Sequence, residues 1–124
     1  MKKLLLISLM MLVGSAWAEW VMVDVNENIQ YFYDPTTIRK EGQIRRVWRL
    51  QNLMQPGKDG ERSRRMRLEY DCKNERHNVL SFSYHSEHFA NGKELSSEKG
   101  LPASWADIPP GTVGETMLKI VCSK

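Results

Sequence analysis

Residues 65–72 read RMRLEYDC and alternate at every position between a charged side chain and an apolar, aromatic or cysteine side chain. Because successive side chains of a β-strand point to opposite faces, this pattern predicts a half-buried strand, from about Arg62 to Cys72. One face would hold Met66, Leu68, Tyr70 and Cys72, and the other Arg65, Arg67, Glu69 and Asp71. The cysteine is therefore expected on the core side of the sheet.

The preceding segment predicts the partner strand of an antiparallel hairpin. A strand is expected from about Ile44 to Leu53, and residues 55–60 (QPGKDG) have the composition of a hairpin loop. Within this strand we assign Trp48 and Leu50 to the core. The side chains at the alternate positions then point to solvent, because successive residues of a strand face opposite sides. The hairpin would then present four arginines on its solvent face as a candidate binding surface: Arg45, Arg49, Arg65 and Arg67.

The rest of the chain predicts further strands and one helix. Strands are indicated over about residues 20–25, 29–33 and 78–85, and the Gly- and Pro-containing stretch 91–102 favours a hairpin or loop. Thr112 and Glu115 have the spacing of a capping box, which predicts a short helix from about Val113 to Cys122. The expected fold class is α+β: an antiparallel sheet of about five to six strands with this helix packed on it.

The first eighteen residues have the three parts of a secretory signal peptide: two lysines, an apolar run over residues 4–13, and small residues up to Ala18. Ala16 and Ala18 form an A-x-A site, so cleavage between Ala18 and Glu19 is predicted. As a helix the apolar run would span about 15 Å, half of a ~30 Å hydrocarbon core, which argues against an uncleaved anchor. The mature chain, residues 19–124, then has the size of a single domain.

The chain has two cysteines, Cys72 and Cys122. An even pair in an exported chain usually forms a disulfide, which here would tie the helix to the sheet. Free thiols or a metal pair are the alternatives, although cysteines this far apart lack the Cys-x-x-Cys spacing of redox and zinc sites. Neither cysteine lies at the cleavage point, where a bacterial lipoprotein needs one, so we expect no stable membrane anchor in the mature chain.

Charge is divided unevenly along the chain. The formal net charge of +3 includes Lys2 and Lys3, so the mature chain has a net charge of about +1. Residues 39–76 hold twelve Lys or Arg against six Asp or Glu, while the remainder of the mature chain is acidic. Nucleic acid is an unsuitable partner for an exported chain that is nearly neutral overall, so the basic region favours a protein or glycan partner.

Motifs of catalysis and metal binding are absent from the sequence. It contains no G-x-S-x-G, H-E-x-x-H, Walker loop or G-x-G-x-x-G. His85 and His88 are the nearest approach to a metal pair, but at a strand end and in a loop they would not share a face. We therefore expect neither enzyme activity, nor a metal, nor a cofactor.

Two groups of side chains are candidates for binding. The arginine face of the hairpin is one, and its alternative is a solvated surface with ion pairs to Glu69 and Asp71. The second group could form an aromatic ligand platform, but such residues more often fill the core, because each aromatic ring buries ~150–250 Å². It consists of seven aromatic residues: Trp20, Trp48, Trp105, Tyr31, Tyr33, Tyr70 and Tyr84.

Several short motifs follow one another along the mature chain: Trp20, Tyr33-Asp34 with Ile38, Val47-Trp48, Glu69-Tyr70-Asp71-Cys72, Trp105, Ile108-Pro109-Pro110-Gly111 and Val121-Cys122. Their order resembles that of the surface-adhesin protein E family of Gram-negative bacteria. The resemblance implies an antiparallel sheet with helical packing, a Cys72–Cys122 disulfide, and an envelope protein whose best-known relatives bind host matrix proteins such as vitronectin and laminin. Those adhesins are lipoproteins, and no binding residue is carried over from them.

Two functions are compatible with the sequence. The first is an exported cell-envelope interaction protein of the adhesin type, which holds an acidic or glycosylated partner, such as a host matrix protein, through a basic sheet face. The second is a soluble periplasmic accessory domain with a structural or small-ligand role and no adhesive activity. Both predict a periplasmic or secreted protein.

Overall fold

The structure is a computed structural model and describes residues 18–124. Residues 1–17 of the predicted signal peptide lie outside the described residues, and cleavage between Ala18 and Glu19 stays a prediction. Along the chain the elements are β1 (Val21–Val25), β2 (Ile29–Tyr33), the 3₁₀ helix η1 (Pro35–Thr37), β3 (Arg39–Glu41), β4 (Ile44–Leu53), β5 (Ser63–Asp71), β6 (Arg76–His85), the 3₁₀ helix η2 (His88–Ala90), β7 (Glu94–Glu98), β8 (Ala106–Asp107) and α2 (Val113–Cys122).

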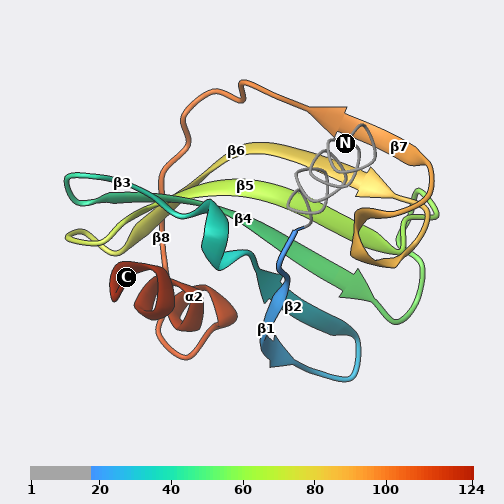
Figure 1. Ribbon diagram of the computed structural model, residues 1–124, viewed down its shortest axis with the longest axis horizontal. Coiled ribbons are helices and arrows are strands. Elements are labelled where there is room, and N and C mark those ends of the chain that lie inside the picture. The colour runs from blue at the N-terminus through green and yellow to red at the C-terminus, as the bar shows by residue number, and fades with distance from the viewer. Residues whose placement is uncertain (1–17) are drawn as a thin grey trace, which may run out of the picture.

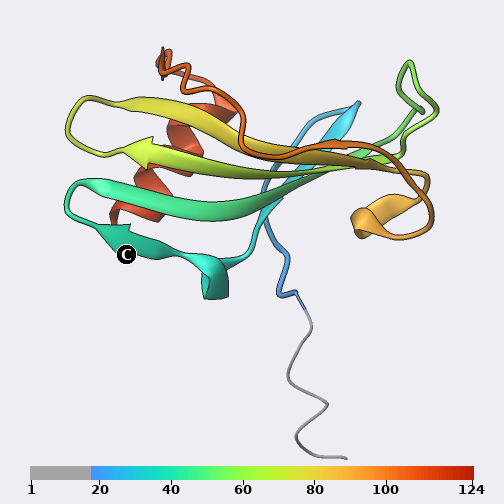
Figure 2. The ribbon, with the colours of Figure 1, turned by 90° about the horizontal axis from the view of Figure 1, so that it is seen from above.

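All strands belong to one antiparallel sheet. Its order is β1-β2-β4-β5-β6-β7, with β3 paired to β4 and β8 paired to β6 (Figure 1). The long strands β4, β5 and β6 form its centre, and α2 and η2 lie near opposite ends of these strands (Figure 2). The predicted fold class is confirmed in its main features, an antiparallel sheet and a C-terminal helix.

The sheet has eight strands, more than the five to six that we expected. The additional strands β3, β7 and β8 have no apolar alternation, because all of their residues are exposed. They join the sheet through backbone pairing and bury no side chain, so side-chain periodicity could not reveal them. The prediction of strand at 44–53 and of helix at 113–122 is confirmed at both ends.

Helix α2 begins with the expected cap. The Thr112 hydroxyl accepts a hydrogen bond from the backbone N–H of Glu115 (3.3 Å), and the Glu115 carboxylate accepts one from the N–H of Gly111 (3.2 Å). The helix buries Met117, Leu118 and Val121 against the sheet. It therefore owes its position to a capped start and an apolar stripe, as the sequence predicts.

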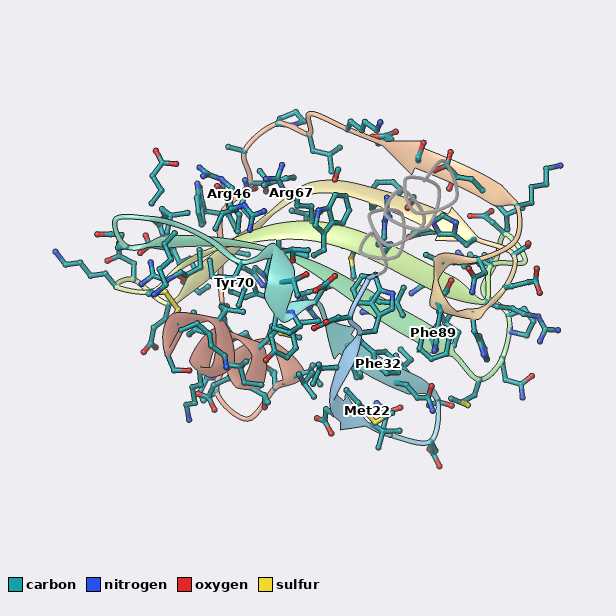
Figure 3. All side chains as sticks on the ribbon, viewed as in Figure 1. Met22, Phe32, Arg46, Arg67, Tyr70 and Phe89 are labelled. Atoms are coloured by element: carbon teal, nitrogen blue, oxygen red, sulfur yellow. A yellow bond between two sulfur atoms is a disulfide. The ribbon has the colours of Figure 1, made fainter. Side chains whose placement is uncertain are left out.

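The main core lies between α2 and one face of the sheet, which we call the helix face. Val47, Tyr70, Met117 and Val121 are fully buried there. Tyr70 lies on the side of the sheet toward α2 (Figure 3). Four further residues complete the cluster: Tyr33, Leu68, Ile108 and Leu118.

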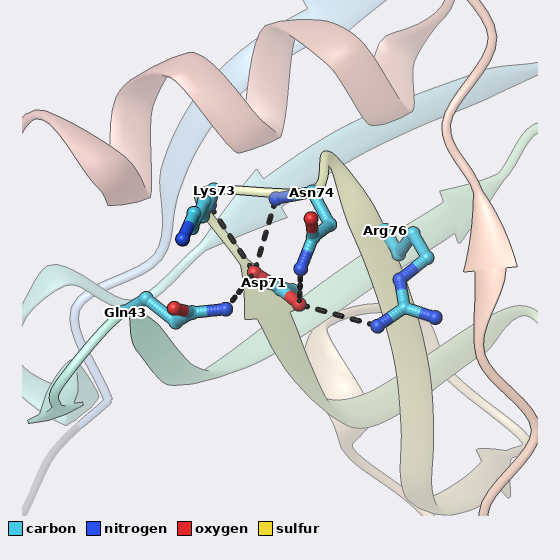
Figure 4. A network of polar contacts seen from close by, with 5 residues as sticks. All are labelled: Gln43, Asp71, Lys73, Asn74 and Arg76. Carbon is cyan, nitrogen blue, oxygen red and sulfur yellow. Dashed lines mark hydrogen bonds and ion pairs between the residues drawn. The ribbon is translucent and has the colours of Figure 1, made fainter.

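A disulfide joins Cys72 and Cys122, which confirms the predicted bridge between sheet and helix. The turn that follows Asp71 is held by this buried carboxylate (Figure 4). The carboxylate accepts hydrogen bonds from the backbone N–H groups of Lys73 and Asn74, both at 3.1 Å. Three side chains also donate to it: Asn74 (2.8 Å), Gln43 (2.8 Å) and Arg76 (3.3 Å). The polar network and the disulfide thus fix the same turn.

The opposite side of the sheet, which we call the groove face, is covered at one end by η2. The buried side chains of Asn52 and Ser63 accept hydrogen bonds from the backbone N–H groups of Phe89 (2.8 Å) and Ala90 (3.0 Å). Leu50 lies on this face and is only 1% exposed. Strand β4 therefore buries side chains on both faces of the sheet.

The predicted arrangement of four arginines on one solvent face is wrong. Residues paired across an antiparallel ladder share a face. Arg45 pairs with Tyr70 and Arg49 with Met66, so both lie on the helix face. Arg65 and Arg67 pair with Leu50 and Trp48 on the groove face. The error arose in β4, where arginine and apolar residues occur in both phases: Val47 joins the core under α2, and Leu50 is buried on the other side.

Candidate functional site

The groove face has a partly open hollow of about 530 Å³, which we call the basic groove. Basic side chains come to it from β4, β5 and the segment after β7, and Trp48 lies among them. Arg46 and Arg67 project on the same side of the sheet (Figure 3). Six residues define its chemistry: Arg46, Trp48, Arg65, Arg67, Leu80 and Lys99.

The strand register explains why these side chains meet. Trp48 lies directly opposite Arg67, and Leu50 opposite Arg65. Residues two apart on a strand point to the same face about 7 Å from one another, so Arg65 and Arg67 stand side by side along β5. A smaller hollow of about 90 Å³ extends the groove past Arg65 and Lys99 toward Glu94 of β7.

A bulge shapes the other wall of the groove. The register of β5 with β6 shifts where Arg67 pairs with Ser81 and Leu68 with Val79, which leaves Leu80 as the extra residue. Bulges redirect side chains and are frequent beside functional sites. Leu80 lines the groove, and its carbonyl accepts a hydrogen bond from the N–H of Leu101 (3.3 Å), which holds the segment after β7 against the sheet.

The cations of the groove differ in their partners. Arg46 forms ion pairs with Glu41 (2.7 Å) and Glu69 (3.3 Å), and the hydrogen bond to Glu41 is the main reason why its pKa is raised. Within residues 18–124, the side chains of Arg65, Arg67 and Lys99 form no ion pair and no hydrogen bond. Three positive charges therefore face the groove without a carboxylate partner.

Arg65 is held in place by an aromatic ring. Its guanidinium carbon lies 4.5 Å from the centre of the Trp48 ring, within the range of a cation–π interaction. This contact orients the side chain but leaves the N–H donors at its edge available to an incoming anion. Trp48, one of the seven aromatic candidates, thus contributes to the groove, whereas Tyr70 and Tyr33 belong to the core.

Arg45 and Arg49 serve the structure on the helix face. Arg49 is 7% exposed and donates a hydrogen bond to the Tyr70 hydroxyl (2.9 Å), and Arg45 donates one to the carbonyl of Gly42 (2.8 Å). Burial raises the pKa of Tyr70, while burial and the charge of Arg49 lower that of His77. This buried cluster is separated from the groove by the sheet itself.

Other predicted candidates engage in local contacts. The ring of His85 is hydrogen bonded to the Ser83 hydroxyl (2.8 Å), and that of His88 to the carbonyl oxygen of Leu53 (2.9 Å). In the part of the chain that the structure describes, no three His, Cys, Asp or Glu residues gather as metal ligands would. Over the same residues, no helix is both long and apolar enough to cross a bilayer.

Sequence reasoning missed two cations of the groove, Arg46 and Lys99, and assigned Trp48 to the wrong face of the sheet. Arg46 lies two residues before Trp48, so both side chains point to the same face of β4. Assigning Trp48 to the face of Arg67 would therefore have placed Arg46 there as well. Trp48 was a candidate as an aromatic residue, but the phase that it shares with Leu50 led to its assignment to the core side. Lys99 follows an exposed edge strand and belongs to no periodic segment, so the sequence contains no signal for it.

Comparison with known proteins identifies the family. Residues 20–123 match the family described as surface-adhesin protein E. Two solved structures of Haemophilus influenzae protein E are similar in fold: one has 18% identity, covers 88% of this chain and 87% of that chain, and has a TM-score of 0.65. The other, from crystal form II, has 19% identity, coverage of 87% and 97%, and a TM-score of 0.62. No curated protein matches significantly. The chain therefore belongs to the surface-adhesin protein E family.

Proposed function

We propose that this protein is an exported cell-envelope interaction protein of the adhesin type, and that it binds an acidic partner through the basic groove. The observation that supports this proposal is the set of three cations, Arg65, Arg67 and Lys99, without an acidic partner among the described residues of a hollow of about 530 Å³. Like charges held this close repel one another, so an anionic partner that offsets them binds favourably.

The site residues that we propose differ from those first expected. Arg65 and Arg67 remain, and Arg46, Trp48 and Lys99 join them. The groove itself offers no pair of groups suited to acid–base or nucleophilic chemistry, since its one hydroxyl, that of Ser81, has no histidine among the residues that line it. Binding without catalysis is therefore the function that its chemistry supports.

The test is capture of immobilised matrix proteins and envelope extracts by the mature domain over a salt series. The double variant Arg65→Ser, Arg67→Ser is expected to lose binding, and wild-type binding is expected to weaken as salt rises, because exposed charges are screened over ~8 Å at physiological ionic strength. Lys40→Ser with Lys119→Ser is the matched control. It removes the same charge from β3 and α2, where both side chains are exposed and lie away from the groove face.

Equal retention of the wild type and the groove variant would contradict the proposal, as would equal losses in the groove and control variants. The second candidate function is that of a periplasmic accessory domain that binds a small ligand. The volume of the groove favours it, because pockets for small molecules have volumes of ~300–1,000 Å³. Localisation separates the two. Protease-accessible protein on intact cells supports adhesion, and release by osmotic shock supports the periplasmic role.

A further inference from the structure

We propose that the basic groove takes an anionic saccharide, a chain that bears sulfate or carboxylate groups, in preference to an acidic peptide. This inference rests on the proposed function and specifies the class of its ligand. Three features of the groove support this inference: the spacing of the cations, the apolar wall beside them, and the hydrogen bonding of the backbone beneath them.

The cations suit anions that recur along a chain. The Cα atoms of Arg65 and Arg67, two residues apart on β5, are separated by about 7 Å, and both side chains point to the groove face. Arg65 and Lys99 line both the main hollow and its smaller extension, where Glu94 lies beside them. The row of cations without a carboxylate therefore belongs to the main hollow. Guanidinium groups bind sulfate and carboxylate oxygens through two parallel N–H donors, which gives such contacts directionality as well as charge. A single small anion would engage only part of this row.

Between the cations the groove offers surfaces for a sugar ring. Leu80 and Leu101 form an apolar wall, and the Ser81 hydroxyl lies in the floor beside Arg67. A pyranose ring has apolar C–H faces and hydroxyls at its rim, so it can contact both kinds of surface. The ring of Trp48 lies under Arg65, and an anion that draws the guanidinium away would expose that ring to the sugar.

An extended peptide finds fewer partners at this position. The groove lies over β4, β5 and β6. The ladder between β4 and β5 is continuous, and the ladder between β5 and β6 is interrupted at Leu80, whose carbonyl accepts a hydrogen bond from the N–H of Leu101. Peptides that bind to sheets gain their affinity by adding to an edge, where main-chain donors and acceptors are free. On the face of the sheet the N–H and C=O groups of a peptide would depend on water, whereas a saccharide has no such groups along its chain.

The test is calorimetric titration of the mature domain with four probes: a heparin-derived hexasaccharide, its desulfated counterpart, a carboxylate-only polygalacturonate oligosaccharide, and an oligoglutamate of the same charge as the first. We expect an acidic saccharide to bind at least tenfold more tightly than the oligoglutamate. The sulfated and carboxylated probes show which anion is preferred. Arg65→Ser with Arg67→Ser should weaken saccharide binding at least tenfold, and the control pair Lys40→Ser with Lys119→Ser less than twofold.

Tryptophan fluorescence gives an independent reading. Binding should change the emission of the wild type, and Trp48→Phe should abolish that change while Trp20 and Trp105 remain. Oligoglutamate that binds as tightly as the saccharides, with dependence on Arg65 and Arg67, would overturn the ligand class and leave the proposed function standing. No binding of any probe, or equal losses in the groove and control variants, would overturn the saccharide proposal, and the capture assay would then decide the proposed function separately.

Discussion

Arg49 shows how one residue can mislead a sequence-based assignment. Its phase in β4 suggested solvent, yet its side chain is buried on the helix face and bonded to the hydroxyl of Tyr70. Its Nε atom is buried and has no hydrogen-bond partner among the described residues. Long arginine side chains can bury their stems, but the charged end then depends strongly on each partner that it retains.

We therefore expect Arg49 and Tyr70 to be energetically coupled. Tyr70→Phe and Arg49→Met should each cost about 1–3 kcal/mol, because each leaves a buried polar group without its partner. The double variant should cost less than the sum of the two by about 0.5–3 kcal/mol, since it leaves neither group behind. Urea unfolding of the three variants and the wild type measures this cycle. Additive effects would show that the hydrogen bond contributes nothing specific.

Asp71 should make stability depend on pH in the acid range. The carboxyl group of Asp71 has a pKa of about 2, and the hydrogen bond that the Asn74 side chain donates to it is the main cause of this low value. Burial acts in the opposite direction and raises the pKa. Because the pKa of the folded state lies below that of the unfolded state, ~3.9, the contribution of Asp71 is complete above about pH 4 and is lost as the pH falls toward 2. Asp71→Asn should remove this part of the pH dependence, as measured by thermal unfolding between pH 2 and 6. An identical pH profile in the variant would refute the assignment.

Among the elements, η2 is the one with a strained backbone. Phe89 and Ala90 both have φ of 58°, in the left-handed region that residues with a Cβ seldom occupy. The hydrogen bonds that the N–H groups of Phe89 and Ala90 donate to the side chains of Asn52 and Ser63 hold this turn. Phe89 also packs on Phe32 with ring centres 5.3 Å apart. The strain is therefore maintained by contacts with β4 and β5.

Relief of this strain should be measurable. The left-handed conformation costs ~1–2 kcal/mol for a residue with a Cβ, and the entropy of an added glycine costs ~0.5–1 kcal/mol. Ala90→Gly should therefore stabilise the fold by a few tenths to about 1 kcal/mol. Ala103→Gly, at an exposed loop position without positive φ, is the control and should be neutral or destabilising. Chemical unfolding compares the two, and a loss of stability in Ala90→Gly equal to that of the control would contradict the assignment of strain.

The elements also show where sequence reasoning succeeds. Strand β5 and helix α2 could be predicted because each has one apolar side and a single clear period. In β4 both phases mix arginine with apolar residues, so the phase cannot be read without knowing that η2 contacts β4 on the second face of the sheet, where Leu50 is buried. That contact is formed by residues about forty positions later in the chain. The same ambiguity hid Arg46 from the candidate site.

At the scale of the whole molecule, the disulfide ties the last turn of α2 to the end of β5. The cysteines are separated by 50 positions, and closing a loop of that length is worth ~4 kcal/mol on the chain-entropy model. Cys122→Ala should lower the free energy of unfolding by about 2–5 kcal/mol. Guanidinium unfolding checks this value, with reduced wild type as the control that should show the same loss. Unchanged stability in both would mean that the helix docks without the bridge.

In the molecule as a whole, the main core and the proposed binding site lie on opposite faces of the sheet. Helix α2, the disulfide and the buried arginine Arg49 belong to the helix face, and the unpaired cations belong to the groove face. The family match supports an adhesin-like surface protein. Under the proposed function, the groove face is the side of the sheet that meets the partner. The claim that binding takes place on the groove face does not depend on the identity of the ligand.

Nuclear magnetic resonance of the labelled mature domain tests this claim most directly. An acidic probe that binds, saccharide or peptide, is added while the side-chain N–H signals of arginine and tryptophan are followed. We expect the signals of Arg65, Arg67 and the Trp48 indole to move, while those of Arg49, Trp20 and Trp105 and of the α2 backbone stay in place. Shifts confined to α2 or to the β1 edge, with Arg65 and Arg67 unchanged, would contradict the account.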